Sequence, residues 1–224
     1  MSSVSVHSGG RRRRGRVIGA LCAVAASAVV VSGCGDGGQG KTSAAAPTAP
    51  AQAVGQTTPG GLTRDQTERQ ALVTSAKIGW DEAADTALAK VPGSKLIEIK
   101  LKRAQAGTPE WESEIAAADG TAHDVHVDAV SGQVTQSRVE SDQDNEDRQQ
   151  LADRLSKAKI TPQQAATTAT DRKQGTVIAV GLEGADSRGP IWSVDVVTKN
   201  DGYKTAFDID AVSGEVLREE VDRD

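Results

Sequence analysis

The stretch Val127-Asp-Ala-Val-Ser-Gly-Gln-Val134 recurs, 82 residues later, as Ile209-Asp-Ala-Val-Ser-Gly-Glu-Val216. Asp, Ser and Gly are residues that favour turns. Each copy therefore predicts a strand that ends in a turn and is followed by a short last strand. Because a motif that returns at a fixed spacing is typical of repeated structural units, we expect the chain to contain one fold twice.

Other blocks recur in the same order, which extends the repeat over most of the chain. Trp111 matches Trp192 at an offset of 81 residues, and Asp119-Gly120 matches Asp201-Gly202 at an offset of 82. The two tryptophans stand at apolar strand positions, so they are expected to be the main aromatic residues of the core. The predicted units span residues 63–140 and 141–224.

Helical patterns open each unit. Charged segments at 64–77 and 146–159 predict a first helix in each unit, and a second helix follows each of them. In the second unit, Thr161 is a good N-cap and Pro162 suits the first helical position. In the first unit the second helix is expected over residues 81–90.

Strand patterns follow the helices. Residues 95–102 alternate between apolar and charged types, which predicts a half-buried strand with Ile97, Ile99 and Leu101 on one face. The Asp-Gly pairs are typical of tight turns between antiparallel strands. The predicted fold class is therefore α+β, with one or two helices of each unit packed on a small antiparallel sheet of three to four strands. The other main strands are expected at 110–115, 123–128, 191–196 and 205–210.

The order of these motifs resembles the PepSY domain family. The resemblance rests on Ile-x-x-x-x-Ala-Ala at Ile78 to Ala84 and above all on the closing Asp-Ala-x-(Ser/Thr)-Gly, present as Asp128 to Gly132 and Asp210 to Gly214. PepSY modules occur in propeptides of thermolysin-type metallopeptidases, and in secreted or membrane-attached proteins thought to restrain peptidases or help them fold. The resemblance implies a non-catalytic regulator or inhibitor of an extracytoplasmic peptidase, acting by protein–protein binding.

The beginning of the chain has the pattern of a targeting segment. Arginines at 11–14 precede an uncharged run from Val17 to Gly33, which is typical of a secretory signal peptide over residues 1–33. A transmembrane helix is the alternative interpretation, but a run of 17 residues rich in Ala, Gly and Ser is short for a span. The run ends in a stretch that resembles the bacterial lipobox, which implies lipidation of the cysteine: Val31, Ser32, Gly33 and Cys34.

These patterns predict a protein held at the outer face of the cell membrane by lipid on Cys34. Residues 34–62 are rich in Gly, Ala, Pro and Thr, which predicts a disordered tether. Loss of the signal peptide would remove five arginines and no acidic residue, and so change the formal charge from −5 to −10. Such an acidic chain is not expected to bind nucleic acid, because phosphate binding needs a basic surface.

The sequence offers few residues for catalysis. Beyond residue 33, His123 and His126 are the only histidines, and Cys34 is the only cysteine. No catalytic residue, cofactor or small-molecule substrate is therefore expected, and the chain is not predicted to be an enzyme. Asp124, His126 and Asp128 share one face of a strand and could bind zinc. The second unit does not repeat this set, which favours a solvated charged face and no metal.

An acidic run at 141–147 resembles part of a calcium loop. However, Asp147 stands where such a loop needs Gly, and its twelfth position is Asp153 rather than Glu. The run is better interpreted as an acidic link into the first turn of a helix, where carboxylates are favourable.

Trp80 is the remaining candidate contact residue, because its counterpart in the repeat is Pro162. An unmatched tryptophan fits a binding role. Together with the long tether, it also leaves open a second function, an envelope-binding or sensory adaptor without a peptidase partner.

Overall fold

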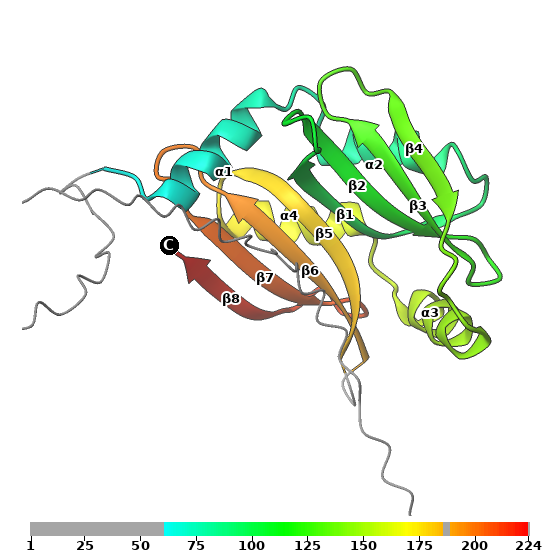
Figure 1. Cartoon of the computed structure of the whole chain (residues 1–224). Helices are drawn as coiled ribbons and strands as arrows, with labels where there is room; N and C mark the ends of the chain where they lie inside the picture. The colour runs from blue at the N-terminus through cyan, green and yellow to red at the C-terminus, as the bar shows by residue number, and fades with distance from the viewer. Residues whose placement is uncertain (1–60, 186–188, 224) are drawn as a thin grey trace, which may run out of the picture. The chain divides into compact units, whose positions relative to one another are not determined.

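A computed structural model describes residues 61–185 and 189–223. The predicted signal peptide, the lipobox with Cys34 and nearly all of the predicted tether lie outside these residues. No described helix is long and apolar enough to cross a membrane. The described elements, shown in Figure 1, are α1 (Arg64–Ser75), α2 (Trp80–Leu88), β1 (Lys95–Arg103), β2 (Pro109–Ala116), β3 (Ala122–Asp128), β4 (Val134–Val139), α3 (Asn145–Lys157), α4 (Pro162–Arg172), β5 (Thr176–Ala185), β6 (Gly189–Val197), β7 (Lys204–Asp210) and β8 (Val216–Asp222).

The expected helices and strands are present, with ends within a few residues of the predicted ones. Thr161 is the N-cap of α4, as predicted, and Pro162 is its first residue. The Thr161 hydroxyl accepts a hydrogen bond from the Gln164 amide at 3.2 Å, and the Gln164 side chain accepts one from the Thr161 amide at 2.8 Å. This reciprocal pair satisfies amides that the first turn of a helix leaves unbonded.

The strands of the two units form a single eight-stranded sheet, so the prediction of a separate small sheet in each unit was wrong. Its strand order is β4-β3-β2-β1-β5-β6-β7-β8, and every neighbouring pair is antiparallel. The units join where β1 pairs with β5, with Ile99 opposite Val180. This pairing removes one open strand edge from each unit, where unpaired backbone groups would otherwise face solvent or a foreign strand.

Ile97 does not share the face of Ile99 and Leu101, so this part of the strand prediction was wrong. A β-bulge between Leu96 and Glu98 adds one residue to β1 relative to β2. Leu96 therefore joins Ile99 in the main core, whereas Ile97 packs in a second cluster with residues that include Leu151 of α3. A bulge reverses the alternation of inward and outward side chains, and period-2 counting does not detect it.

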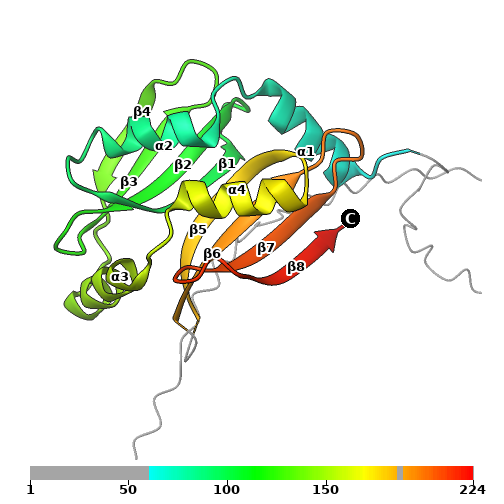
Figure 2. The same cartoon turned by 180° about the vertical axis from the view of Figure 1, so that it is seen from behind.

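Helices α2 and α4 cover one face of the sheet and enclose the main core (Figure 2). Both present alanines to the sheet, which lets the helix backbone approach closely. Trp111 and Trp192 lie in this core with 1% and 2% of their surface exposed, which confirms the prediction for both. The buried helix residues are Ala83, Ala84 and Ala87 in α2 and Ala165, Ala166 and Ala169 in α4.

The first helix of each unit contacts both units: α1 lies against β1 and α3 against β5 and β6 of its own unit, and each also reaches the other unit. Arg69 of α1 donates a hydrogen bond to the carbonyl of Gly202, in the β6–β7 turn, at 2.8 Å. Reciprocally, Gln143, just before α3, donates to the carbonyl of Gly120, in the β2–β3 turn, at 2.9 Å. The turn glycine of each unit, Gly120 or Gly202, thus contacts the first helix of the other unit. The sequence assigned each of these helices to its own unit and did not predict these contacts.

Candidate functional site

The repeated Asp-Ala-Val-Ser-Gly motif builds a turn, as its composition predicts. Oδ1 of Asp128 accepts hydrogen bonds from the amides of Val130 and Ser131 at 3.0 and 2.7 Å, and Asp210 accepts the equivalent pair at 2.8 and 2.7 Å. Hydrogen bonds from the serine amides, above all, hold the pKa of both carboxyls below their ordinary value. Gly132 adopts a φ of 71° at the end of the turn, a conformation that favours glycine.

The alanine of the motif joins the turn to the segment before the second helix. The Ala129 carbonyl accepts hydrogen bonds from the amides of Lys77 and Ile78 at 2.7 and 2.9 Å, and Ala211 does the same in the second unit. The Trp111 Nε1 atom then donates to the Ile78 carbonyl at 3.0 Å. The motif therefore holds helix, turn and core tryptophan together, so its residues serve the fold rather than a reaction.

Trp80 lines a hollow in the described surface. This hollow has a volume of about 690 Å³ and lies between the C-terminal end of α1, the start of α2, the end of α4 and the adjoining strand ends. Its walls include apolar groups from Leu101, Trp111 and Val177, and Lys77 and Lys199 also line it. Trp80 is partly buried against the main core. The hollow therefore has room for an apolar group beside Trp80.

The hollow depends on both units, since it combines Trp80 and Trp111 of the first with Val177 and Val197 of the second. Sequence reasoning selected Trp80 by its lack of a counterpart but did not identify the other lining residues. Helix α1 and the β1–β5 junction bring them together, and neither arrangement follows from a pattern within one unit.

A charged network occupies the face of the sheet opposite α2 and α4. His126 lies between two carboxylates, with Nδ1 2.9 Å from Oε1 of Glu110 and Nε2 3.1 Å from Oδ1 of Asp124. Asp128, the third member of the predicted zinc set, is bonded to its own turn. Of the predicted zinc set, Asp124 and His126 therefore lie together, whereas Asp128 does not join them. The carboxylates that extend the network come from β2, because the β2–β3 register places Glu112 directly opposite His126.

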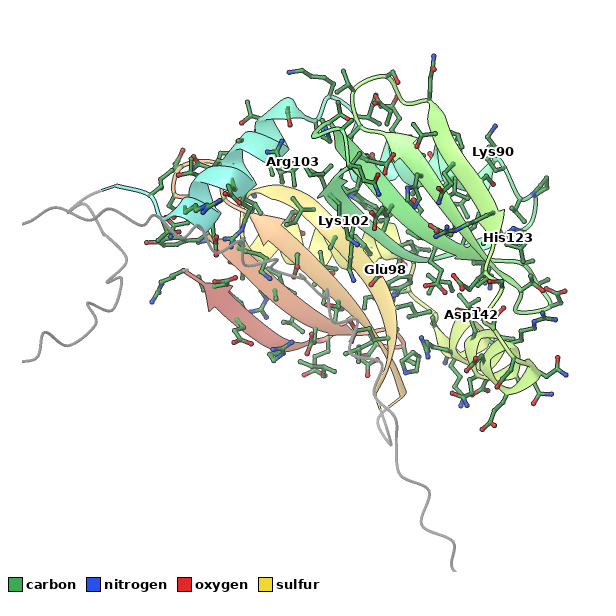
Figure 3. The ribbon with its side chains drawn as sticks, in the orientation of Figure 1. Lys90, Glu98, Lys102, Arg103, His123 and Asp142 are labelled. Carbon is green, nitrogen blue, oxygen red and sulfur yellow. The ribbon has the colours of Figure 1, made fainter. Side chains whose placement is uncertain are left out.

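Figure 3 shows other charged side chains near this network. Glu98 and Lys102 lie on β1, whereas His123 of β3 stands opposite the core residue Ile115 in the β2–β3 register. Glu98 pairs with Lys100 at 2.6 Å, and Lys102 pairs with Glu112 at 2.5 Å. Acidic and basic side chains are therefore mixed on this face, as expected for a solvated sheet surface.

The acidic run at 141–147 starts a helix, as the preferred interpretation predicted. Asp144 is the N-cap of α3, and its side chain accepts a hydrogen bond from the Asp147 amide at 2.9 Å. Asp147 returns the contact by accepting from the Asp144 amide at 3.2 Å. Both carboxylates are thus engaged with the helix start, not directed toward a common centre for calcium.

Comparison with known proteins identifies one family. The model of the peptidase propeptide and YPEB domain family, PepSY, matches residues 77–138 and 159–220. The two matches cover more than half of the chain, and they leave out α1 and α3. Domains of this kind are propeptide- or inhibitor-type modules and are usually non-catalytic. No curated protein matches the sequence.

Several solved structures resemble the chain at low sequence identity. A proposed lipoprotein from Clostridium difficile 630 is 20% identical, with a TM-score of 0.42, over 66% of this chain and 95% of its own. The YpmB protein from Bacillus subtilis is 17% identical, with a TM-score of 0.28, over 63% and 96%. A proposed periplasmic protein from Bacteroides eggerthii is 14% identical, with a TM-score of 0.25, over 65% and 90%. TM-scores this low do not establish a common arrangement of the whole chain.

Proposed function

The chain belongs to the PepSY family, and from that premise we propose that it is a lipid-anchored extracytoplasmic protein that binds a peptidase and restrains it or helps it fold. The chain itself catalyses no reaction in this proposal. The lipobox-like stretch ending at Cys34 supplies the membrane anchor, and residues 34–62 give the folded part its reach. The family match motivates the choice of a peptidase as the partner.

The observation that carries the proposal is the hollow beside Trp80. Tryptophan is one of the residue types enriched among strong contributors to protein–protein binding, and such residues contribute most in well-packed pockets that exclude water. Here the indole is partly buried, and Leu101 and Trp111 provide further apolar surface. We assign the partner contact to this hollow, which accepts an apolar side chain from a protruding loop of the peptidase.

The first experiment identifies the partner on intact cells. The full chain, tagged after Asp224, is crosslinked on the cell surface, and the bound proteins are identified by mass spectrometry. Enrichment of one extracytoplasmic peptidase, followed by saturable binding and a change in its activity or refolding yield, supports the proposal. Failure to bind any extracytoplasmic peptidase of the host contradicts it, and enrichment of transporters or sensor kinases instead would establish the adaptor function.

The second experiment locates the contact. Trp80→Ala is expected to weaken peptidase binding about 10- to 100-fold, the effect of removing a strong interface anchor. The matched control is Pro162→Ala, which changes the equivalent position of the repeat, outside this hollow. Both variants are checked by circular dichroism. Unchanged binding by a folded Trp80→Ala variant would show that the contact lies elsewhere on the protein.

A further inference from the structure

Three potential metal ligands meet on the open face of the first unit. One ligand atom from each of Glu110, Glu112 and His126 lies within 4.8 Å of the other two. His126 is directly opposite Glu112 in the β2–β3 register, and Glu110 is two residues away on the same face of β2. Hydrogen-bonded strands hold such positions more rigidly than a loop does, which favours a preformed site.

The groups behind the ligands are arranged as in metal sites. A histidine that binds a metal with one ring nitrogen usually donates the other N–H to a carboxylate, which fixes the ring. Here Nδ1 of His126 faces Glu110, and Nε2 lies 3.1 Å from Oδ1 of Asp124. Arg138 holds Asp124 in turn, with Nε and Nη2 at 3.0 and 2.6 Å from Oδ2. Glu110 is held from its other oxygen by the Thr135 hydroxyl, at 2.8 Å.

We propose that Glu110, Glu112 and His126 bind one divalent transition-metal ion of the zinc class. One imidazole and two carboxylates are a ligand set that Zn²⁺ accepts, and three protein ligands leave a fourth position for water or a group from a partner. The side chains of His126 and Glu110 are 18% and 13% exposed, so the ion would be partly shielded yet reachable.

Lys102 is the competing cation. Its ammonium lies 2.5 Å from Oε2 of Glu112, so the metal must displace it. Removing this charge by Lys102→Met should therefore tighten metal binding. If the network is purely structural, Lys102→Met creates no metal binding and only leaves Glu112 without its ion-pair partner.

The second unit provides an internal comparison. In the matched register, Ser193 faces Asp208, and Ile191 stands where Glu110 does. A hydroxyl and an isoleucine cannot replace two carboxylates, and no histidine is present there. The proposal therefore predicts one ion per chain rather than two.

The experiment titrates the full chain with Zn²⁺ by calorimetry, with any free cysteine thiol alkylated so that thiols cannot bind the metal. We expect one ion per chain, binding lowered at least tenfold by Glu112→Gln and abolished by His126→Gln. His123→Gln is the control and should bind normally, because His123 lies outside the three-ligand group. Asp124→Asn should weaken binding about 10- to 100-fold, the usual effect of losing the carboxylate behind a histidine ligand.

Co²⁺ provides a second readout, because its visible absorption reports the ligand geometry. An absorption band that saturates at one Co²⁺ per chain and disappears in His126→Gln supports the site. Absence of Zn²⁺ binding, or binding that His126→Gln and Glu112→Gln leave unchanged while both variants remain folded by circular dichroism, overturns the proposal.

Discussion

At the residue scale, each of the two core tryptophans both fills the apolar core and forms a hydrogen bond. Each ring is buried under the helices, while its N–H donates to the carbonyl of the residue that precedes the second helix by two positions, Ile78 or Ile160. The same segment is bonded to the Asp-Ala-Val-Ser-Gly turn. A tryptophan at this position therefore fixes the helix relative to the sheet, beyond filling space between them.

Replacement of Trp192 should separate these roles. Trp192→Ala is expected to lower the free energy of unfolding by about 3–5 kcal/mol. Trp192→Phe, which keeps a ring but loses the N–H, should lower it by about 1–3 kcal/mol. Urea unfolding measures both, with Trp80→Ala as the control, because Trp80 is only partly buried and should cost less than Trp192→Ala. Equal stability of Trp192→Phe and the unchanged protein would mean that the hydrogen bond to Ile160 adds nothing.

At the element scale, the β2–β3 turn contacts α3 and the β6–β7 turn contacts α1, each a helix of the other unit. Gly120 has a φ of 82°, and a methyl group there would overlap the Arg148 carbonyl oxygen of α3. Gly202 is matched, since a methyl group would lie 2.9 Å from the Gln66 carbonyl oxygen of α1. These glycines are needed for close approach as well as for the turn.

Gly120→Ala tests this contact against a matched control. Gly107 has nearly the same φ, 85°, but nothing lies within 4 Å of an added methyl group. Gly107→Ala should therefore cost only the left-handed backbone conformation, about 1–2 kcal/mol. Gly120→Ala should cost about 1–3 kcal/mol more, because α3 must move. Chemical unfolding measures both, and equal costs would contradict the close packing of α3 on this turn.

At the edges of the sheet, charge pairs reinforce the last strands. Arg138 of β4 pairs with Asp124, and Arg218 of β8 pairs with Asp208 at 2.7 Å. Both edge strands are largely exposed. Charged side chains on such strands discourage pairing with the strands of other chains.

At the scale of the whole described part, the two units share one continuous sheet. The β1–β5 pairing makes the sheet continuous. Helix α1 and the segment just before α3 also each form a hydrogen bond with a turn of the other unit. Opening either unit therefore exposes surface of both. The repeat is visible in sequence, but the folded body is not a pair of independent modules.

The full chain is therefore expected to unfold in one calorimetric transition. The van't Hoff enthalpy should equal the calorimetric enthalpy, as in a two-state domain. Ala179→Pro in β5, opposite Lys100 of β1, should lower the melting temperature of the whole transition, because proline disrupts a central strand. Two resolved transitions, one for each unit, would contradict this coupling.

Local sequence features were sufficient to predict the helices, the turns and the core tryptophans. Thr161 and Pro162 predicted the start of α4, the Asp-Gly pairs predicted the turns, and Trp111 and Trp192 were identified as core residues. Each of these features depends on neighbours within a few residues or on burial of a large ring, so the sequence alone determined them. The PepSY family was recognisable for the same reason, since its motif encodes a turn.

Only the tertiary structure decided how the pieces meet. The bulge at Ile97, the β1–β5 pairing and the crossed helices depend on contacts between residues far apart in the sequence. Both candidate sites depend on such contacts too. Trp80 and Val177 come from different units and line one hollow, and His126 of β3 pairs with Glu110 of the neighbouring strand β2. A one-residue change in the register between two strands alters which side chains face each other. The pattern of residues along a single strand does not determine that register.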